Sequence, residues 1–463
     1  MIMIEKGNRG ENSIMGHVIK RKHLTSSQII MSGFLGVILI GTILLMLPIS
    51  SKNGQWTGIL EAMFTATSSV CVTGLVIYDT ATYWSWFGQG VILLLIQIGG
   101  MGVVTLAVSI AIISGKKIGL MQRSTMQEAI SAPRIGGIVK LTGFILRTTL
   151  VIEILGAILL SFVFCKDFGL GRGLWYAIFH SISAFCNAGF DLMGGTTPFS
   201  SLTRYQDNLF VNMVIMGLIV IGGIGFLTWD DIKNNYKNKK KYRMQTKVIL
   251  LMTTILIIVP TILFLVFEFS GSEWSDMTFG EKVLGAMFQA VTPRTAGFNT
   301  VDLSQFSEAG IMIMIFLMLT GGAPGSTAGG MKITTVAVLF LNMFAVFHKK
   351  ESTECFGRRI EEQTVKNAAS LLVLYLMLSL TGAIVISRVE QLPMLICFFE
   401  TASAIGTVGL TLGITSTLSA ASKIILVLLM FFGRVGGLTL AFATISEKQA
   451  HGSSLPKEKI TVG

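Results

Sequence analysis

The chain has 463 residues, of which 52% are hydrophobic and only 13% are charged. Soluble proteins carry about 25% charged residues, so this composition excludes an ordinary soluble domain and predicts a polytopic membrane protein. The net charge of +11 would suit a nucleic-acid partner, but the basic residues lie between hydrophobic segments. We therefore expect membrane lipid, and no nucleic acid, as the surrounding partner. The five cysteines show no CxxC spacing, which argues against a disulfide scaffold or a zinc site.

Hydrophobic windows of about twenty residues, the length that crosses a bilayer, predict an all-α protein with eight transmembrane helices. The sixth is interrupted by a run rich in glycine and proline at 321–330. The eight windows are 29–48, 90–114, 141–165, 208–230, 247–268, 309–320 continuing through 331–347, 368–387 and 421–445.

Four apolar segments are too short to span the membrane. One lies between the first and second windows, and the others lie between the third and fourth, the fifth and sixth, and the seventh and eighth. They lead into Gly74, Gly189, Gly297 and Gly409, at intervals of 108 to 115 residues. This spacing predicts four repeats, each made of a span, a half-helix with a re-entrant pore loop, and a second span, around a central pore. The expected divisions are an N-terminal tail 1–28, repeats at 29–114, 141–230, 247–347 and 368–445, and a C-terminal tail 446–463.

Lysine and arginine set the expected orientation. The two tails and the three connections between repeats contain 25 of the 36 basic residues, whereas the opposite side contains eight. By the positive-inside rule, both termini are cytoplasmic and the half-helices enter the membrane from outside.

The four loops indicate an ion filter. Irregular backbone at membrane depth is tolerated only inside protein or against a water-filled cavity. Each half-helix would point its partly negative carbonyl end at the axis, and the glycine after it permits positive φ. Rings of carbonyl oxygens replace the hydration shell of a dehydrated cation. The predicted ion-binding residues are Val72, Thr73, Gly74, Asn187, Ala188, Gly189, Thr295, Ala296, Gly297, Thr407, Val408 and Gly409.

Two further features of the predicted filter residues can be seen in the sequence. None of its residues is a carboxylate, so a divalent-selective acidic ring is not expected. The third unit is also irregular, because Phe288 stands nine residues before its glycine, whereas the corresponding phenylalanines of the other units stand ten before. A glycine of this kind can instead serve close helix packing, but four in register favour the filter.

A gate is predicted below the filter. Arg434 lies within the last span with no carboxylate near it in sequence. It is either a structural arginine that caps backbone carbonyls, or a positive barrier or latch whose hydrogen bonds go to the carbonyls that the disrupted sixth span leaves unpaired. Lys332 either joins this latch or extends its ammonium toward the membrane surface. The predicted gate residues are Gly321, Gly322, Ala323, Pro324, Gly325, Ser326, Thr327, Ala328, Gly329, Gly330, Lys332 and Arg434.

The four loop strings resemble the pore loops of the Trk/Ktr/HKT superfamily of potassium transporters. They read FTATSSVCVTGL, FHSISAFCNAGF, FQAVTPRTAGFN and FETASAIGTVGLT, and QIGGMG, GGIG and FFGRVGGLT resemble the helices that follow the loops. The length and tails look most like the bacterial Ktr membrane subunit, of the KtrB/KtrD type. Plant relatives often have serine at the first filter glycine, so Gly74 favours potassium over sodium.

The resemblance implies K⁺ uptake across a bacterial plasma membrane, commonly with Na⁺ as a coupling or activating ion. It further implies a homodimer on a cytoplasmic regulatory ring of the RCK/KTN type (KtrA/KtrC-like). ATP on that ring would favour activity and ADP oppose it. The chain itself shows no dinucleotide fingerprint, so nucleotide is expected only on the partner subunit.

Other functions fit less well. A secondary transporter usually has two inverted repeats rather than four parallel ones, and a less selective Na⁺/K⁺ permease stays an alternative. An enzyme is not expected, because HExxH and GxSxG are absent and only His180 lies near a membrane segment. The sequence leaves open whether Arg294 pairs with Glu400 or Asp302, or whether these acids attract cations at the entrance.

Overall fold

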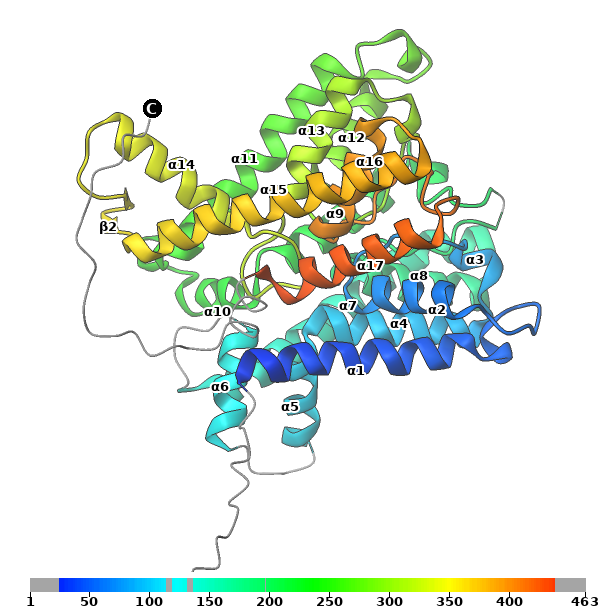
Figure 1. Cartoon of the computed structure of the whole chain (residues 1–463), viewed down its shortest axis with the longest axis horizontal. Coiled ribbons are helices and arrows are strands. Elements are labelled where there is room, and N and C mark those ends of the chain that lie inside the picture. The colour runs from blue at the N-terminus through cyan, green and yellow to red at the C-terminus, as the bar shows by residue number, and fades with distance from the viewer. Residues whose placement is uncertain (1–24, 114–118, 131–135, 196, 438–463) are drawn as a thin grey trace, which may run out of the picture.

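The computed structural model describes residues 25–113, 119–130, 136–195 and 197–437, and the regular secondary structure of this part is helical apart from one short hairpin. The predicted C-terminal tail, the end of the last repeat from 438, and all but four residues of the N-terminal tail lie outside the described residues. Helices from distant parts of the sequence lie side by side, as α2 (Ile59–Val70) and α17 (Ala420–Val435) show in Figure 1.

Four long helices form the first element of each predicted repeat. They have 21 to 31 residues, and in the described part of the chain they are the four helices that are each long and apolar enough to cross a membrane alone. They are α1 (Ser26–Met46), α7 (Ile138–Phe168), α11 (Met244–Phe267) and α15 (Glu362–Glu390). Each is only 28–33% buried over its apolar window, as expected for helices that face lipid.

Four shorter helices correspond to the predicted half-helices. They are α2 (Ile59–Val70), α8 (Leu170–Phe185), α12 (Phe279–Val291) and α16 (Met394–Gly406). Each buries the phenylalanine that marks its register, with Phe64, Phe179 and Phe288 fully buried and Phe399 at 1% exposure. At 12 to 16 residues they are too short to span a bilayer.

The second helix is interrupted in the first three predicted repeats, whereas we expected only the sixth span to be broken; in the fourth, α17 ends at Val435, close to the end of the described residues. Gly102 follows the end of α4 (Trp86–Met101), Gly225 precedes α10 (Phe226–Asn235), and Gly436 follows the end of α17 (Ala420–Val435). All three glycines have positive φ. The chain turns by 93° between α9 and α10, so the window 208–230 is not one straight helix. The helices are α4 (Trp86–Met101), α5 (Val103–Ile113), α9 (Leu209–Gly223), α10 (Phe226–Asn235), α13 (Glu308–Leu319), α14 (Ile333–Phe347) and α17 (Ala420–Val435).

The connections contain short elements. A two-stranded antiparallel hairpin lies in the connection before α15, and α6 lies in the connection between the first two repeats. The elements are α3 (Thr80–Tyr83), α6 (Leu120–Ala129), β1 (Glu354–Cys355), β2 (Arg358–Arg359), and the 3₁₀ turns η1 (Pro48–Ser50), η2 (Thr203–Tyr205), η3 (Lys239–Lys241), η4 (Ser272–Trp274) and η5 (Leu303–Gln305).

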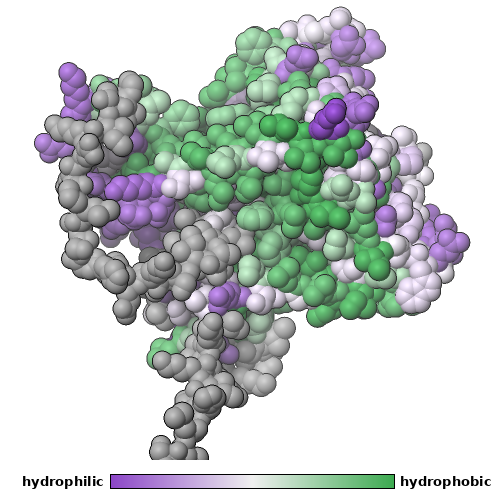
Figure 2. Space-filling view, in the orientation of Figure 1, coloured by the Kyte–Doolittle hydropathy of each residue, from purple (hydrophilic) through white to green (hydrophobic). Residues whose placement is uncertain are grey.

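The surface is banded in the way that a membrane requires. Figure 2 shows hydrophobic residues across the middle of the face formed by α1, α15 and α17, with hydrophilic residues gathered at the two ends of these helices. The lipid-facing side chains are large and apolar, including Leu39, Ile40 and Ile43 on α1, each about 60% exposed. Soluble monomers rarely expose so much apolar surface, so these side chains are expected to contact the hydrocarbon of the membrane.

Candidate functional site: a ring of four loops

The four loops after the half-helices meet in a closed ring. The α-carbon of Gly74 lies against the carbonyl oxygen of Ala188, so that a Cβ there would overlap it. The same contact joins each loop to the next and the fourth to the first. The pairs are Gly74 with Ala188, Gly189 with Ala296, Gly297 with Val408, and Gly409 with Thr73. The residue types therefore follow from close approach, since only glycine fits beside these carbonyls.

The backbone of the four loops repeats the same conformation. φ is positive at each glycine and also two residues before it, at Val72, Asn187, Thr295 and Thr407. Left-handed backbone is a genuine outlier for β-branched residues, and three of these four are β-branched. Holding such a residue in this conformation costs about 1–3 kcal/mol of conformational energy, so the conformation persists only where the surrounding structure imposes it. The strain recurs at equivalent positions, which marks the loops as a built site.

A hydroxyl side chain at or near the end of each half-helix braces the loop that follows it. Ser68 Oγ and Ser403 Oγ accept from the amides of Gly74 (3.0 Å) and Gly409 (3.1 Å). Ser183 Oγ and Thr292 Oγ1 instead donate to the carbonyls of Phe190 (2.7 Å) and Phe298 (2.5 Å). Sequence reasoning missed these four residues. The signal was present, because each stands four residues after its phenylalanine.

This spacing also locates the irregularity of the third unit. Ser68, Ser183 and Ser403 lie six residues before their glycines, whereas Thr292 lies five before Gly297. The half-helix keeps its register, so the missing residue falls within the loop that contains Pro293 and Arg294.

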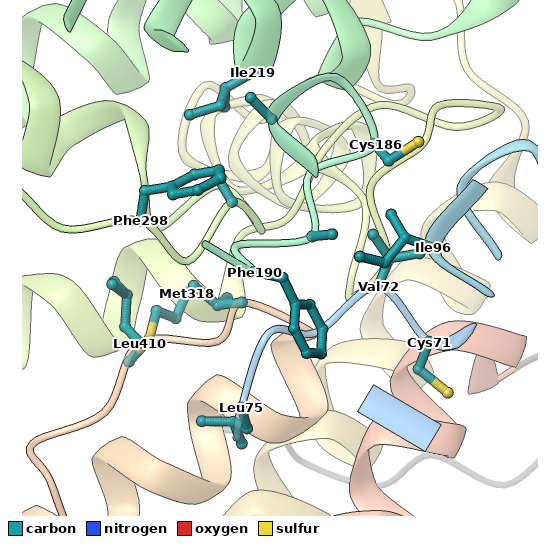
Figure 3. Close-up of a cluster of buried hydrophobic side chains, with 14 of the residues drawn as sticks. Cys71, Val72, Leu75, Ile96, Cys186, Phe190, Ile219, Phe298, Met318 and Leu410 are labelled. Carbon is teal, nitrogen blue, oxygen red and sulfur yellow. The ribbon is translucent and has the colours of Figure 1, made fainter. Parts of the chain in front are cut away.

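The residues that follow the four glycines form an apolar collar around the loops. Leu75, Phe190, Phe298 and Leu410 are 0–2% exposed and belong to one buried cluster. Figure 3 shows them on four separate chain segments that come together. Tight packing of these four side chains restricts changes in the dimensions of the ring, because protein interiors resist small changes of volume.

Below the ring, the Gly321–Gly330 segment lies directly against the loop residues. Thr327 Oγ1 is 3.0 Å from both the Phe185 carbonyl and Asn187 Oδ1. A Cβ on Gly329 would overlap Thr407 Oγ1, and one on Gly321 would contact Thr295. The segment therefore touches three of the four predicted filter loops, at their residues of positive φ.

The two basic residues of the predicted gate hold this segment differently. Arg434 Nη1 donates to the Thr327 carbonyl at 2.5 Å, while Nη2 donates to the carbonyls of Gly99 and Gly100 at the end of α4. Arg434 thus ties the segment to the first repeat. Lys332 Nζ donates to Ala328 O (2.7 Å) and Gly329 O (3.3 Å), which are within the segment itself.

Neighbouring elements hold the tip of the segment. The Phe226 amide donates to the Gly325 carbonyl at 2.7 Å, and a Cβ on Gly325 would contact the Ile130 carbonyl just beyond α6. A cavity of 280 Å³ beside the segment is lined by residues that include Lys332 and Arg434. None of the twelve predicted filter residues lines this cavity, so the space lies next to the segment and not within the ring.

The structure separates the charged residues whose pairing the sequence left open. Glu400 is fully buried and accepts from Thr411 Oγ1 (2.9 Å) and from Thr415 Oγ1, so it braces the chain beyond the fourth loop. Arg294 is 3% exposed and donates to Thr253 Oγ1 on α11 at 3.3 Å. Its carbonyl accepts from Asn187 Nδ2 at 3.2 Å, which links the third loop to the second. Asp302 accepts from Ser304 within its own turn.

Comparisons with known proteins agree with this architecture. The sequence profile of a family described as cation transport protein, TrkH, matches residues 14–452. The chain is 41% identical over 449 residues to the potassium/sodium uptake protein NtpJ of Enterococcus hirae, covering 96% of this chain and 98% of that protein. It is 39% identical to the Ktr system potassium uptake protein B of Bacillus subtilis, covering 94% and 96%.

A solved structure has the same fold. The crystal structure of the potassium transporter TrkH from Vibrio parahaemolyticus superposes with a TM-score of 0.68 at 21% identity, covering 93% of this chain and 86% of that one. The resemblance drawn from the loop strings is confirmed, and the family is one of transporters rather than enzymes. The chain is a multi-pass membrane protein that belongs to the TrkH family of cation transport proteins.

Proposed function

We propose that this chain is the ion-translocating subunit of a potassium uptake system, and that K⁺ moves inward through the ring of loop carbonyls. The observation that carries the proposal is the closed set of four glycine–carbonyl contacts, one between each pair of neighbouring loops. The C-terminal ends of four half-helices, each with a partial negative charge, precede these loops. No carboxylate lies among the twelve filter residues, which favours a monovalent ion over a divalent one.

The proposed topology keeps the eight spans, with each interrupted second helix counted as one. Both termini and the three connections between repeats are then cytoplasmic, in a bacterial plasma membrane. The basic composition of those connections supports this orientation.

Gly321–Gly330 is the proposed gate. It blocks the path below the ring while Arg434 holds Thr327, and it conducts after moving into the adjoining cavity. The contacts of Thr327 with Asn187 and Phe185 support this assignment, because they place the segment against the loop ends.

Sodium dependence, a homodimeric assembly and control by a cytoplasmic nucleotide-binding subunit of the RCK type complete the proposal. Two names bear on parts of this proposal: one relative is called a potassium/sodium uptake protein, and another belongs to a Ktr system, a name that implies a partner subunit. ATP or ADP would bind that partner subunit.

A less selective Na⁺/K⁺ permease is the second candidate, favoured by the name of the relative that is 41% identical. The two candidates differ in one measurable quantity, the ratio of K⁺ to Na⁺ taken up when both ions are present.

The test is complementation of a bacterial strain that lacks its own potassium uptake systems. We expect growth at low potassium and uptake of K⁺, strengthened by a co-expressed regulatory subunit and by added sodium. Equal uptake of Na⁺ and K⁺ would select the permease. Failure to restore growth in any combination, with the protein present in the membrane, would overturn both candidates.

A further inference from the structure

Two adjoining cavities lie where α7 begins, beside α10. They measure 710 and 500 Å³ and share Lys140, Phe144 and Lys233 in their walls. Arg243 completes the first cavity and Arg147 the second. Together they form one basic hollow on the face from which the first helix of the second repeat enters the membrane.

The four cations of this hollow face a single carboxylate, so positive charge is in excess. Lys140, Arg147, Lys233 and Arg243 are exposed, and within the described residues none of their side chains forms an ion pair or a hydrogen bond. The single carboxylate of the wall, Asp230, accepts from Asn234 Nδ2 at 3.1 Å.

Lys233 shows how the hollow is organised. Its Nζ lies 4.6 Å from the centre of the Phe144 ring, a cation–π contact that turns the ammonium toward α7. The hollow is therefore strongly positive and open to an anion.

The hollow lies at the boundary of the hydrocarbon. On α7 the cations end at Arg147, and the next cation along that helix is Lys166. Nineteen residues separate them (166−147), which at 1.5 Å per residue is about 28 Å, close to the ~30 Å hydrocarbon core. Between them the exposed face of α7 is apolar, with Val151 in the wall of the hollow and Leu150, Ile154, Leu155 and Ile158 beyond it.

We propose that this hollow binds the headgroup of an anionic phospholipid, with an acyl chain lying along the apolar face of α7. The phosphate would accept from Lys140, Arg147 and Lys233, and a positively charged choline or ethanolamine group would be repelled. Basic hollows at the inner end of membrane helices commonly bind such headgroups. The apolar strip that continues from the wall favours a lipid over free phosphate, which has no use for it.

The test measures phospholipid binding to the purified full chain by native mass spectrometry, with phosphatidylglycerol or phosphatidylcholine added. The variant K140Q/R147Q/K233Q removes three cations from the hollow. The matched control K239Q/K240Q/K241Q removes three exposed cations of η3, which line neither cavity. We expect phosphatidylglycerol affinity to fall roughly fivefold for each cation, about a hundredfold for three, in the first variant alone.

Each other outcome decides against the proposal. Equal losses in the two triple variants would mean unspecific attraction to charge, and equal binding of the two lipids would mean that the headgroup is not recognised. Displacement of phosphatidylglycerol by the same concentration of inorganic phosphate would make this a phosphate site. Loss of a co-expressed regulatory subunit without loss of lipid would make it a protein-docking surface. If the triple variant fails to fold, R147Q and K233Q singly must each weaken phosphatidylglycerol binding about fivefold.

Discussion

Replacing Arg434 by glutamine should open the proposed gate. The guanidinium connects two parts of the chain, since Nη1 holds the Thr327 carbonyl and Nη2 holds the end of α4. Glutamine is shorter and neutral, so it cannot make both connections. The Gly321–Gly330 segment would then lose its attachment to the first repeat.

The expected increase in the open population follows from the loss of one hydrogen bond, between Arg434 and Thr327. Of the hydrogen bonds that Arg434 donates, one reaches the segment itself, to Thr327 at 2.5 Å. A hydrogen bond to a charged group contributes about 1.5–3 kcal/mol. Losing it from the closed state alone shifts the ratio of open to closed segment by roughly 10- to 150-fold.

The assay is K⁺ uptake into cells or proteoliposomes without the regulatory subunit, where the closed state should limit the rate. We expect Arg434→Gln to raise that rate at least tenfold. Lys332→Gln is the matched control, because it removes a cation whose bonds go to Ala328 and Gly329, inside the segment. Its effect should be smaller. An unchanged or lower rate in Arg434→Gln, with the protein inserted normally, would refute the latch.

Three further predictions concern the ring and its outer mouth. Ser403→Ala leaves the buried Gly409 amide without its acceptor, which costs about 1–3 kcal/mol. This variant should lower K⁺/Na⁺ discrimination measured by competitive uptake. Unchanged discrimination would mean that the hydrogen bond from Gly409 to Ser403 is dispensable. Burial raises the pKa of Asp191, two residues beyond Gly189, to about 7, assisted by the nearby Asp79 carboxylate and opposed by the Met193 amide. Asp191 is neutral below that pH and negative above it, so K⁺ uptake at low salt should rise from pH 6 to pH 8 as cations are attracted. Asp191→Asn should flatten this rise, and an equally steep profile in that variant would exclude Asp191 as its source.

The four glycine loops could be located from the sequence because local signals coincide. A half-helix too short to span, a phenylalanine at fixed distance and a glycine recur four times, and the structure brings the four glycines into one ring. The braces Ser68, Ser183, Thr292 and Ser403 share the same spacing and could have been found in the same way.

The breaks in the second helices could not be predicted, because glycines in the same short stretch either allow close packing of helices or end a helix. In the run from Gly99 to Gly102, the first glycine packs against the Val70 carbonyl at the end of α2, while the last ends the helix with positive φ. Composition does not distinguish these roles. Only the packed structure shows which glycine meets a neighbouring backbone.

The partners of the buried charges also lay beyond sequence reasoning. Arg434 bonds to Gly99, which is 335 residues away, and Glu400 turns to Thr411 and Thr415 rather than to Arg294. The partners of these side chains depend on how distant segments pack against one another, and the periodicity of the sequence does not contain that information. The left-handed conformation of Val72, Thr295 and Thr407 was equally hidden, since the residue type argues against it.

The most direct test of the carbonyl ring is the K⁺/Na⁺ uptake ratio of Gly74→Ser beside that of Gly413→Ser. Both glycines have φ near +92°, so serine strains the backbone equally. Only Gly74 lies against a carbonyl of the next loop, whereas a Cβ on Gly413 has open space. If the ring selects K⁺, Gly74→Ser lowers the ratio and Gly413→Ser keeps it. An unchanged ratio in Gly74→Ser, or the same fall in both variants, would contradict the account.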